Sequence, residues 1–174
     1  MAKIIIFRCA NDALRDHISW IVYRALANQA VQPHAFWRNN QRLLLNAPQT
    51  PLFTPQGNPC KFKALMEIHT QQVGVLCTAS TPQTIWHGIA TLCREGADII
   101  VVGVKCNAHG QIPDQRQIFD ALTFDGHEIV IPPIVIPNIR NYPVHEPNND
   151  LDYFVQQIAN AVMDGINELN NQNR

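Results

Sequence analysis

The chain has 174 residues, of which 46% are hydrophobic and 16% charged, and its formal net charge is −1. This length fits one domain, residues 1–174, that buries a core of its own. Thirteen basic against fourteen acidic residues exclude a broad nucleic-acid or anionic-membrane footprint, which needs a basic excess. Five cysteines, an odd number, argue against a secreted disulfide framework. Since residues 4–7 are too short an apolar run for a signal peptide or a membrane span, we expect a soluble, cytoplasmic protein with no nucleic-acid or membrane partner.

The first third of the chain alternates apolar and polar segments. Residues 3–7, KIIIF, are β-branched and apolar, which predicts a strand buried on both faces. Apolar residues spaced by three and four predict a helix over 18–26. Residues 34–37 predict a second strand, and 43–45 a third strand or its continuation. Four prolines and a glycine within 46–59 predict a loop.

The middle of the chain repeats this alternation. Residues 62–68 are interpreted as a short helix, and 84–92 as another with one apolar face. Residues 98–104, DIIVVGV, predict the clearest central strand of the sequence. Residues 115–122 predict a helix and 128–131 a strand.

A proline-broken loop over 132–149 and a long helix over 151–169 complete the pattern. Strands that alternate with helices predict an α/β fold, a three-layer sandwich with a mainly parallel sheet of four to five strands. Ligands of such sheets bind at the carboxyl ends of the strands, so we expect the site in the loops after residues 7, 104 and 131.

The loop after the first strand carries the strongest chemical signal. Cys9 and Arg15 are separated by five residues, which are Ala10, Asn11, Asp12, Ala13 and Leu14. An arc of that length before a helix wraps its backbone N–H groups around an oxyanion, which the arginine also binds. The positive field of the helix N-terminus and the arginine also lowers the pKa of a cysteine at this place. The resulting thiolate is a nucleophile for attack on phosphorus or arsenic. The alternative interpretation is a small buried cysteine and a surface arginine.

Four collinear segments resemble low-molecular-weight protein tyrosine phosphatases and the arsenate reductases built on the same fold. The match favours the arsenate-reductase branch, in which the second segment opens a helix. The segments are 3–26 (KIIIFRCANDALRDHISWIVYRAL), 56–68 (QGNPCKFKALMEI), 97–108 (ADIIVVGVKCNA) and 132–147 (PPIVIPNIRNYPVHEP).

The resemblance implies a role for each matching residue. Cys9 is the expected nucleophile, Arg15 the oxyanion clamp, and residues 10–15 the binding loop. Glu146, before a proline, matches the general acid, although another alignment places Asn138 there. Cys106 matches the second cysteine of a thiol relay that ends in thioredoxin. The expected ligand is phosphate, arsenate or a phosphorylated substrate.

The sequence departs from this family in three places. Ile131 stands where the third relay cysteine is expected, and Asp12 and Asp16 replace an asparagine and a serine. Carboxylates near the thiolate disfavour its charged form, although Asp16 could instead cap a helix. The remaining cysteines, Cys60, Cys77 and Cys93, are interpreted as packing residues.

Three functions are therefore left open. The first is a cysteine phosphatase or arsenate reductase, and the second is an inactive relative that binds phosphate or regulates. The third, a flavin mononucleotide protein, rests on the Ser80-Thr81 turn after an apolar strand and on residues 131–133. Because the histidines show no zinc spacing and no nucleotide fingerprint occurs, we expect neither a metal nor a cofactor for the first two.

Overall fold

A computed structural model describes residues 1–55, 57, 59–138 and 149–174 of the chain. The strands are β1 (Lys3–Cys9), β2 (Val31–Arg38), β3 (Gln41–Leu45), β4 (Phe62–Ile68), β5 (Gln71–Cys77), β6 (Ile99–Lys105), β7 (Glu128–Val130) and β8 (Val135–Ile136). The helices are α1 (Asp12–Ala27), α2 (Pro82–Arg94), α3 (Gln115–Phe124) and α4 (Asn149–Gln172). The α/β class expected from the sequence is confirmed.

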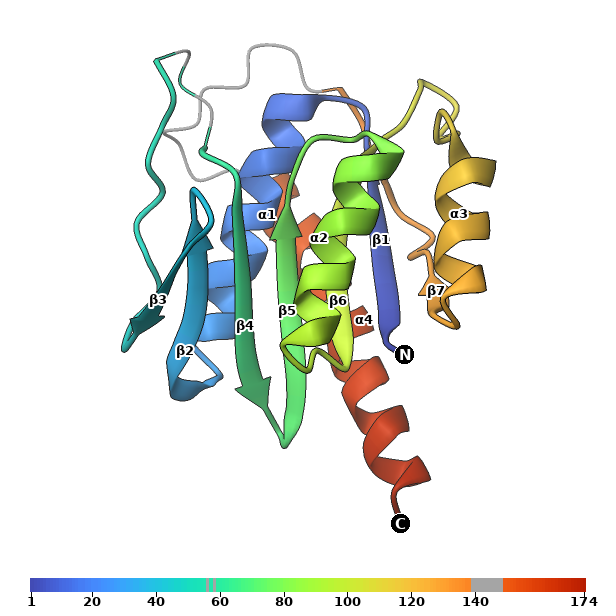
Figure 1. Ribbon diagram of the computed structural model, residues 1–174. Helices are drawn as coiled ribbons and strands as arrows, with labels where there is room; N and C mark the ends of the chain where they lie inside the picture. Colours follow the sequence, from blue (N-terminus) through green and yellow to red (C-terminus); the bar gives the residue numbers. More distant parts are fainter. Residues whose placement is uncertain (56, 58, 139–148) are drawn as a thin grey trace.

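Within the described residues, eight strands form one mixed sheet in the order β3-β2-β4-β5-β6-β1-β7, and β8 also pairs with β1 (Figure 1). The half that contains β5, β6, β1 and β7 is parallel. The half that contains β3, β2 and β4 is antiparallel, and β4 also runs antiparallel to β5. The sheet is thus larger and more mixed than the four to five mainly parallel strands expected.

Two tight hairpins cause this difference. Asn39 and Asn40 connect β2 to β3, and His69 and Thr70 connect β4 to β5, all with positive φ angles. Two-residue turns of this geometry fit the twist of antiparallel strands. The helix expected over 62–68 is wrong, because this segment is β4, paired with β2 on one side and β5 on the other.

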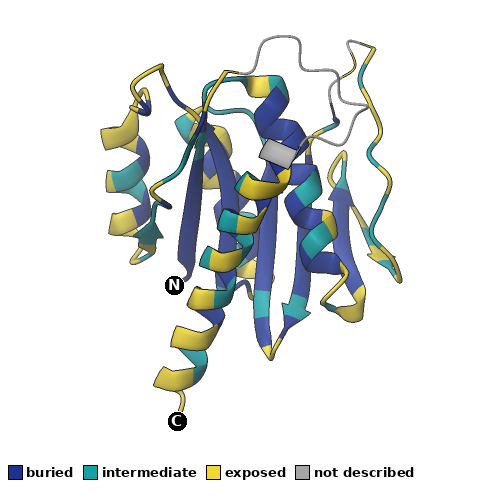
Figure 2. Ribbon diagram, turned by 180° about the vertical axis from the view of Figure 1, so that it is seen from behind, coloured by how far each residue is buried: buried dark blue, intermediate teal, exposed yellow. Residues whose placement is uncertain are grey.

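Helices cover both faces of the sheet, so the molecule has three layers (Figures 1 and 2). Residues of α1 and α4 pack with one face of the sheet in the larger core, and those of α2 and α3 pack with the opposite face. The burial of β1 and β6 on both faces explains why their sequences are continuous apolar runs rather than alternating ones.

In the part of the chain that the structure describes, no helix has both the length and the hydrophobicity needed to cross a bilayer.

Candidate functional site

The carboxyl ends of β1 and β6 lie side by side at one edge of the sheet. Cys9 pairs with Lys105, and the next residue, Cys106, donates its backbone N–H to the Cys9 carbonyl at 2.9 Å. From this edge the chain turns from β1 into α1 on one face, and from β6 toward α3 on the opposite face. Adjacent parallel strands whose connections leave on opposite faces form the crevice in which α/β sheets bind ligands.

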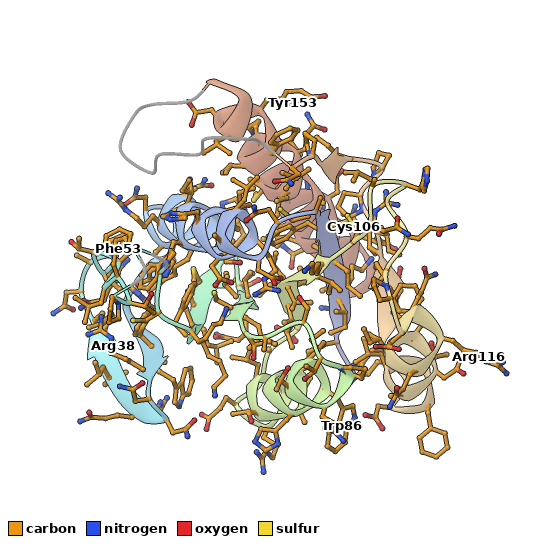
Figure 3. All side chains as sticks on the ribbon, turned by 90° about the horizontal axis from the view of Figure 1, so that it is seen from above. Arg38, Phe53, Trp86, Cys106, Arg116 and Tyr153 are labelled. Carbon is orange, nitrogen blue, oxygen red and sulfur yellow. The ribbon has the colours of Figure 1, made fainter. Side chains whose placement is uncertain are left out.

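Figure 3 looks onto this edge and places Cys106 between the two helix layers. The sequence-predicted loops after residues 7 and 104 therefore meet here. Asn138, from the third expected loop, accepts a hydrogen bond from Asn11 Nδ2 at 3.2 Å. Glu146, the expected general acid, lies outside the described residues.

Cys9 is fully buried, and its thiol donates to the Asn11 carbonyl at 3.3 Å. Burial raises the pKa of Cys9 to about 11, and the Asn11 contact and Arg15 offset only part of that effect. The thiol is therefore protonated at neutral pH. A thiolate nucleophile requires the opposite shift.

The backbone after Cys9 is helical sooner than the expected oxyanion arc allows. Helix α1 begins at Asp12, so only Ala10 and Asn11 separate it from β1. Asn11 caps the helix by accepting from the Leu14 N–H at 3.0 Å. The alternative that Asp16 caps this helix is wrong, because Asp16 lies inside α1.

Three of the N–H groups expected to face an anion already have acceptors within the chain. Ala10 donates to the Ile136 carbonyl at 3.0 Å, Leu14 to the Asn11 side chain, and Arg15 to the Asn11 carbonyl at 2.9 Å. Within the described residues, no acceptor contacts the amides of the remaining three, Asn11, Asp12 and Ala13.

The Arg15 guanidinium is 3% exposed and binds two carboxylates. Nη1 donates to Asp12 at 2.9 Å, and Nε and Nη2 donate to one oxygen of Asp16 at 3.2 and 3.0 Å. Nη1 also donates to the Ser80 hydroxyl. These contacts turn Arg15 toward its own helix and the β5–α2 loop.

Two lysines complete this network. Lys61 Nζ lies 2.5 Å from the second oxygen of Asp16, and Lys105 Nζ lies 3.5 Å from Asp12. The Ser80 hydroxyl also accepts the Lys105 backbone N–H at 3.0 Å. We name the five side chains of Asp12, Arg15, Asp16, Lys61 and Lys105 the charge cluster. Three cations and two carboxylates give it a formal charge of +1.

Sequence reasoning missed both lysines. Lys105 follows the strongest predicted strand, so its place at the carboxyl edge was a usable signal. Lys61 gave no such signal, because the segment after it was interpreted as a helix. Ser80 was singled out as a flavin contact, whereas its hydroxyl accepts from Arg15 and from the Lys105 backbone.

The five cysteines are free thiols. Cys106 is buried beside the end of β1, and burial raises its pKa while the Arg8 charge opposes this. Cys77 is buried with its thiol 3.5 Å from Asp16, and Cys60 and Cys93 are half-buried. Within the described ranges, no three His, Cys, Asp or Glu side chains are grouped to hold a metal ion.

Comparisons with known proteins leave the function to be argued from the chain itself. The chain matches no protein-family model, no curated protein and no solved structure. The roles that the family resemblance implies for Cys9, Arg15 and Cys106 remain predictions.

Proposed function

We propose that this protein binds a small oxyanion, phosphate or a phosphorylated ligand, at the charge cluster without covalent chemistry at Cys9. In this proposal the chain is an inactive relative of the low-molecular-weight phosphatases and arsenate reductases. The observation that carries it is the position of a cluster of charge +1 at the crevice between β1 and β6.

The exposure of the cluster supports binding from solvent. The side chains of Lys105 and Asp12 are 52% and 55% exposed, whereas Arg15 and Asp16 are buried beneath them. An anion that contacts Lys105 and the first amides of α1 would gain from one unbalanced positive charge and from the helix dipole. Arg15 would support this site by holding Asp12 in place.

The state of Cys9 favours binding over turnover. A thiol with a pKa near 11 supplies little thiolate at neutral pH, and Arg15 is engaged by carboxylates rather than turned toward an anion. Both features oppose the attack on phosphorus or arsenic that the resemblance implies. The adjacent Cys106 has a raised pKa as well.

Calorimetric titration with phosphate and with tungstate tests the binding. The wild-type chain binds, and Lys105→Met weakens the affinity about fivefold, the loss expected for one screened charge contact. Arg116→Met removes the same charge from an exposed position on α3 and is the matched control. Absence of binding by the wild-type chain would overturn the proposal.

The inert Cys9 is tested separately. Because Cys9 is fully buried and its pKa is raised to about 11, we expect no measurable alkylation of Cys9 by iodoacetamide in the folded protein at pH 7. Peptide mapping with Cys9→Ser as the blank identifies the site. Hydrolysis of p-nitrophenyl phosphate that Cys9→Ser abolishes would show a working nucleophile and contradict this half of the proposal.

A further inference from the structure

A second polar site lies beside the charge cluster, next to helix α2 on the face of the sheet opposite to α1. A cavity of about 250 Å³, open to solvent on one side, is lined by the β2–β3 turn, the start of β4, the end of β5 and the first turns of α2. Gly88 lets α2 approach here, since a Cβ at this position would lie 2.6 Å from Leu76. The volume suits a small metabolite rather than a nucleotide.

Among the described residues, the titratable side chains that line the cavity are the basic Lys61, Lys63 and His87 and the thiol of Cys77, and none of them is a carboxylate. Lys61 already pairs with Asp16 in the charge cluster. Lys63 therefore carries the uncompensated charge.

Lys63 is held in place by the register of the sheet. It lies directly between Trp37 of β2 and Leu76 of β5, two buried residues of the core that faces α2. Directly paired residues share a face of the sheet, so the lysine stem packs along apolar neighbours. Within the described part of the chain, no carboxylate or other acceptor contacts its ammonium group.

The position of the Lys63 ammonium group is energetically unfavourable in the protein without a bound ligand. Burial lowers the pKa of Lys63, with no opposing contact from a neighbour. A half-buried cation without an acceptor is stabilised by an incoming anion, because the anion replaces the water that burial removed.

The other lining groups indicate which anion fits. Thr78, Asn39 and Asn40 also line the cavity and bring neutral hydrogen-bonding groups to it, whereas the Thr84 hydroxyl already donates to the Ala79 carbonyl at 2.6 Å. Lysine ammoniums act as point charges, and the Thr78 hydroxyl and the Asn39 and Asn40 amides donate from other directions, as a tetrahedral phosphate requires. Among the described lining residues there is no arginine, whose planar fork matches a carboxylate.

We propose that the cavity between the β2–β3 turn, β4 and α2 binds a small phosphate monoester, with Lys63 as its principal anchor. This site shares one residue with the charge cluster but does not depend on the function proposed for that cluster. Lys61 belongs to both sites, so a ligand in the cavity competes with Asp16 for that one lysine.

Trp37 gives a direct signal for this site, because it lines the cavity. Titration of the full chain with glycerol 3-phosphate is expected to change the tryptophan fluorescence, whereas glycerol does not. Trp37→Phe removes the fluorescence change but leaves the calorimetric heat of binding. Trp86→Phe, on the same side of the sheet, is the matched control and keeps the signal.

Lysine variants then separate the two sites. Lys63→Met is expected to weaken the binding of glycerol 3-phosphate at least tenfold. Lys63→Arg is expected to retain most of the wild-type affinity. Lys105→Met weakens binding at the charge cluster and leaves the fluorescence titration unchanged. The cavity proposal is wrong if glycerol 3-phosphate does not change the fluorescence of the wild-type chain. It is also wrong if Lys105→Met abolishes this change, or if Lys63→Met leaves the affinity for glycerol 3-phosphate unaltered. Equal affinity for succinate would overturn the choice of phosphate.

Discussion

Asp16 is a buried carboxylate that holds two cations from different parts of the chain. One oxygen accepts from Arg15 and the other contacts Lys61, which precedes β4. The pair Arg15–Asp16 is almost fully buried, whereas half of the Lys61 side chain is exposed. Removal of one buried partner leaves the other charge without compensation, and this costs more than removal of both.

A double-mutant cycle is expected to show this coupling. Asp16→Leu lowers the free energy of unfolding by less than the about 3–5 kcal/mol of a fully uncompensated buried charge, because Arg15 keeps its contact with Asp12. Arg15→Met combined with Asp16→Leu is less destabilised than the sum of the two single variants. Urea unfolding at pH 7 measures all four proteins, and strictly additive losses would contradict the coupling.

His34 is part of a buried network whose hydrogen positions are determined by its neighbours. Gln32 Nε2 donates to the Ala27 carbonyl at 2.9 Å, so its amide oxygen faces His34 Nδ1 at 2.9 Å. His34 Nδ1 therefore carries the proton, and Nε2 accepts from the Tyr23 hydroxyl at 2.6 Å. The Tyr23 oxygen in turn accepts from the Gln49 N–H. This arrangement requires a neutral imidazole.

Stability is expected to depend on pH through this histidine. Burial lowers the pKa of His34 below its ordinary value of 6.5, so the folded state binds the proton less tightly than the unfolded chain. The free energy of unfolding is therefore highest above pH 6.5 and falls as the pH drops below that value. His127, whose pKa burial also lowers, adds in the same direction.

Urea midpoints at pH 8 and pH 5 measure this effect. The difference between the urea midpoints at the two pH values is smaller in His34→Gln than in the wild-type chain. His127→Gln removes the part of this difference that His127 contributes. An unchanged difference in His34→Gln would show that this histidine does not contribute.

At the scale of elements, Gly103 determines how closely β6, β1 and α1 pack. A Cβ at Gly103 would lie 2.4 Å from the Phe7 ring and 2.7 Å from Arg15 Cγ. Because Phe7 and Arg15 are both buried, neither side chain has room to move. The absence of a side chain at this position leaves room for the Arg15 side chain against β6, from where its guanidinium reaches Ser80.

Gly103→Ala is therefore expected to lower the free energy of unfolding by about 1–3 kcal/mol, the usual cost of overpacking. Gly74→Ala is the matched control on the neighbouring strand β5, where the nearest atom is the Leu92 methyl at 3.1 Å. A loss at Gly103 no larger than at Gly74 would contradict the close packing.

The elements also explain how far sequence patterns lead. The sequence predicted the buried strands at 3–7 and 98–104 and the helices α2 and α3. Burial on one or two faces of an element produces a local pattern of apolar residues, which can be recognised in the sequence. Segment 62–68 was not, since Ala64, Leu65, Met66 and Glu67 favour helices and only pairing with β2 and β5 makes them a strand.

At the scale of the whole molecule, the edge that holds the candidate site was predictable, but its contacts were not. Strand–helix alternation located Cys9, Asn11 and Cys106 at the carboxyl ends of the strands. The partners of Arg15 depend on where α1 begins, and a shift of a few residues turns an anion-binding loop into a helical turn. The cavity of Lys63 arises from four segments that meet only in the folded chain.

The position of β1 in the sheet has a consequence for how the chain reaches its structure. Lys3 pairs with Ile99 on one side and Glu128 on the other, so the first strand of the chain is flanked by two of the last. A nascent chain that ends before β6 exposes both edges of an apolar strand, a template for association with other chains. We expect this sheet to close only after β6 and β7 have been synthesised, with the closure of β1 between them as a late and slow step.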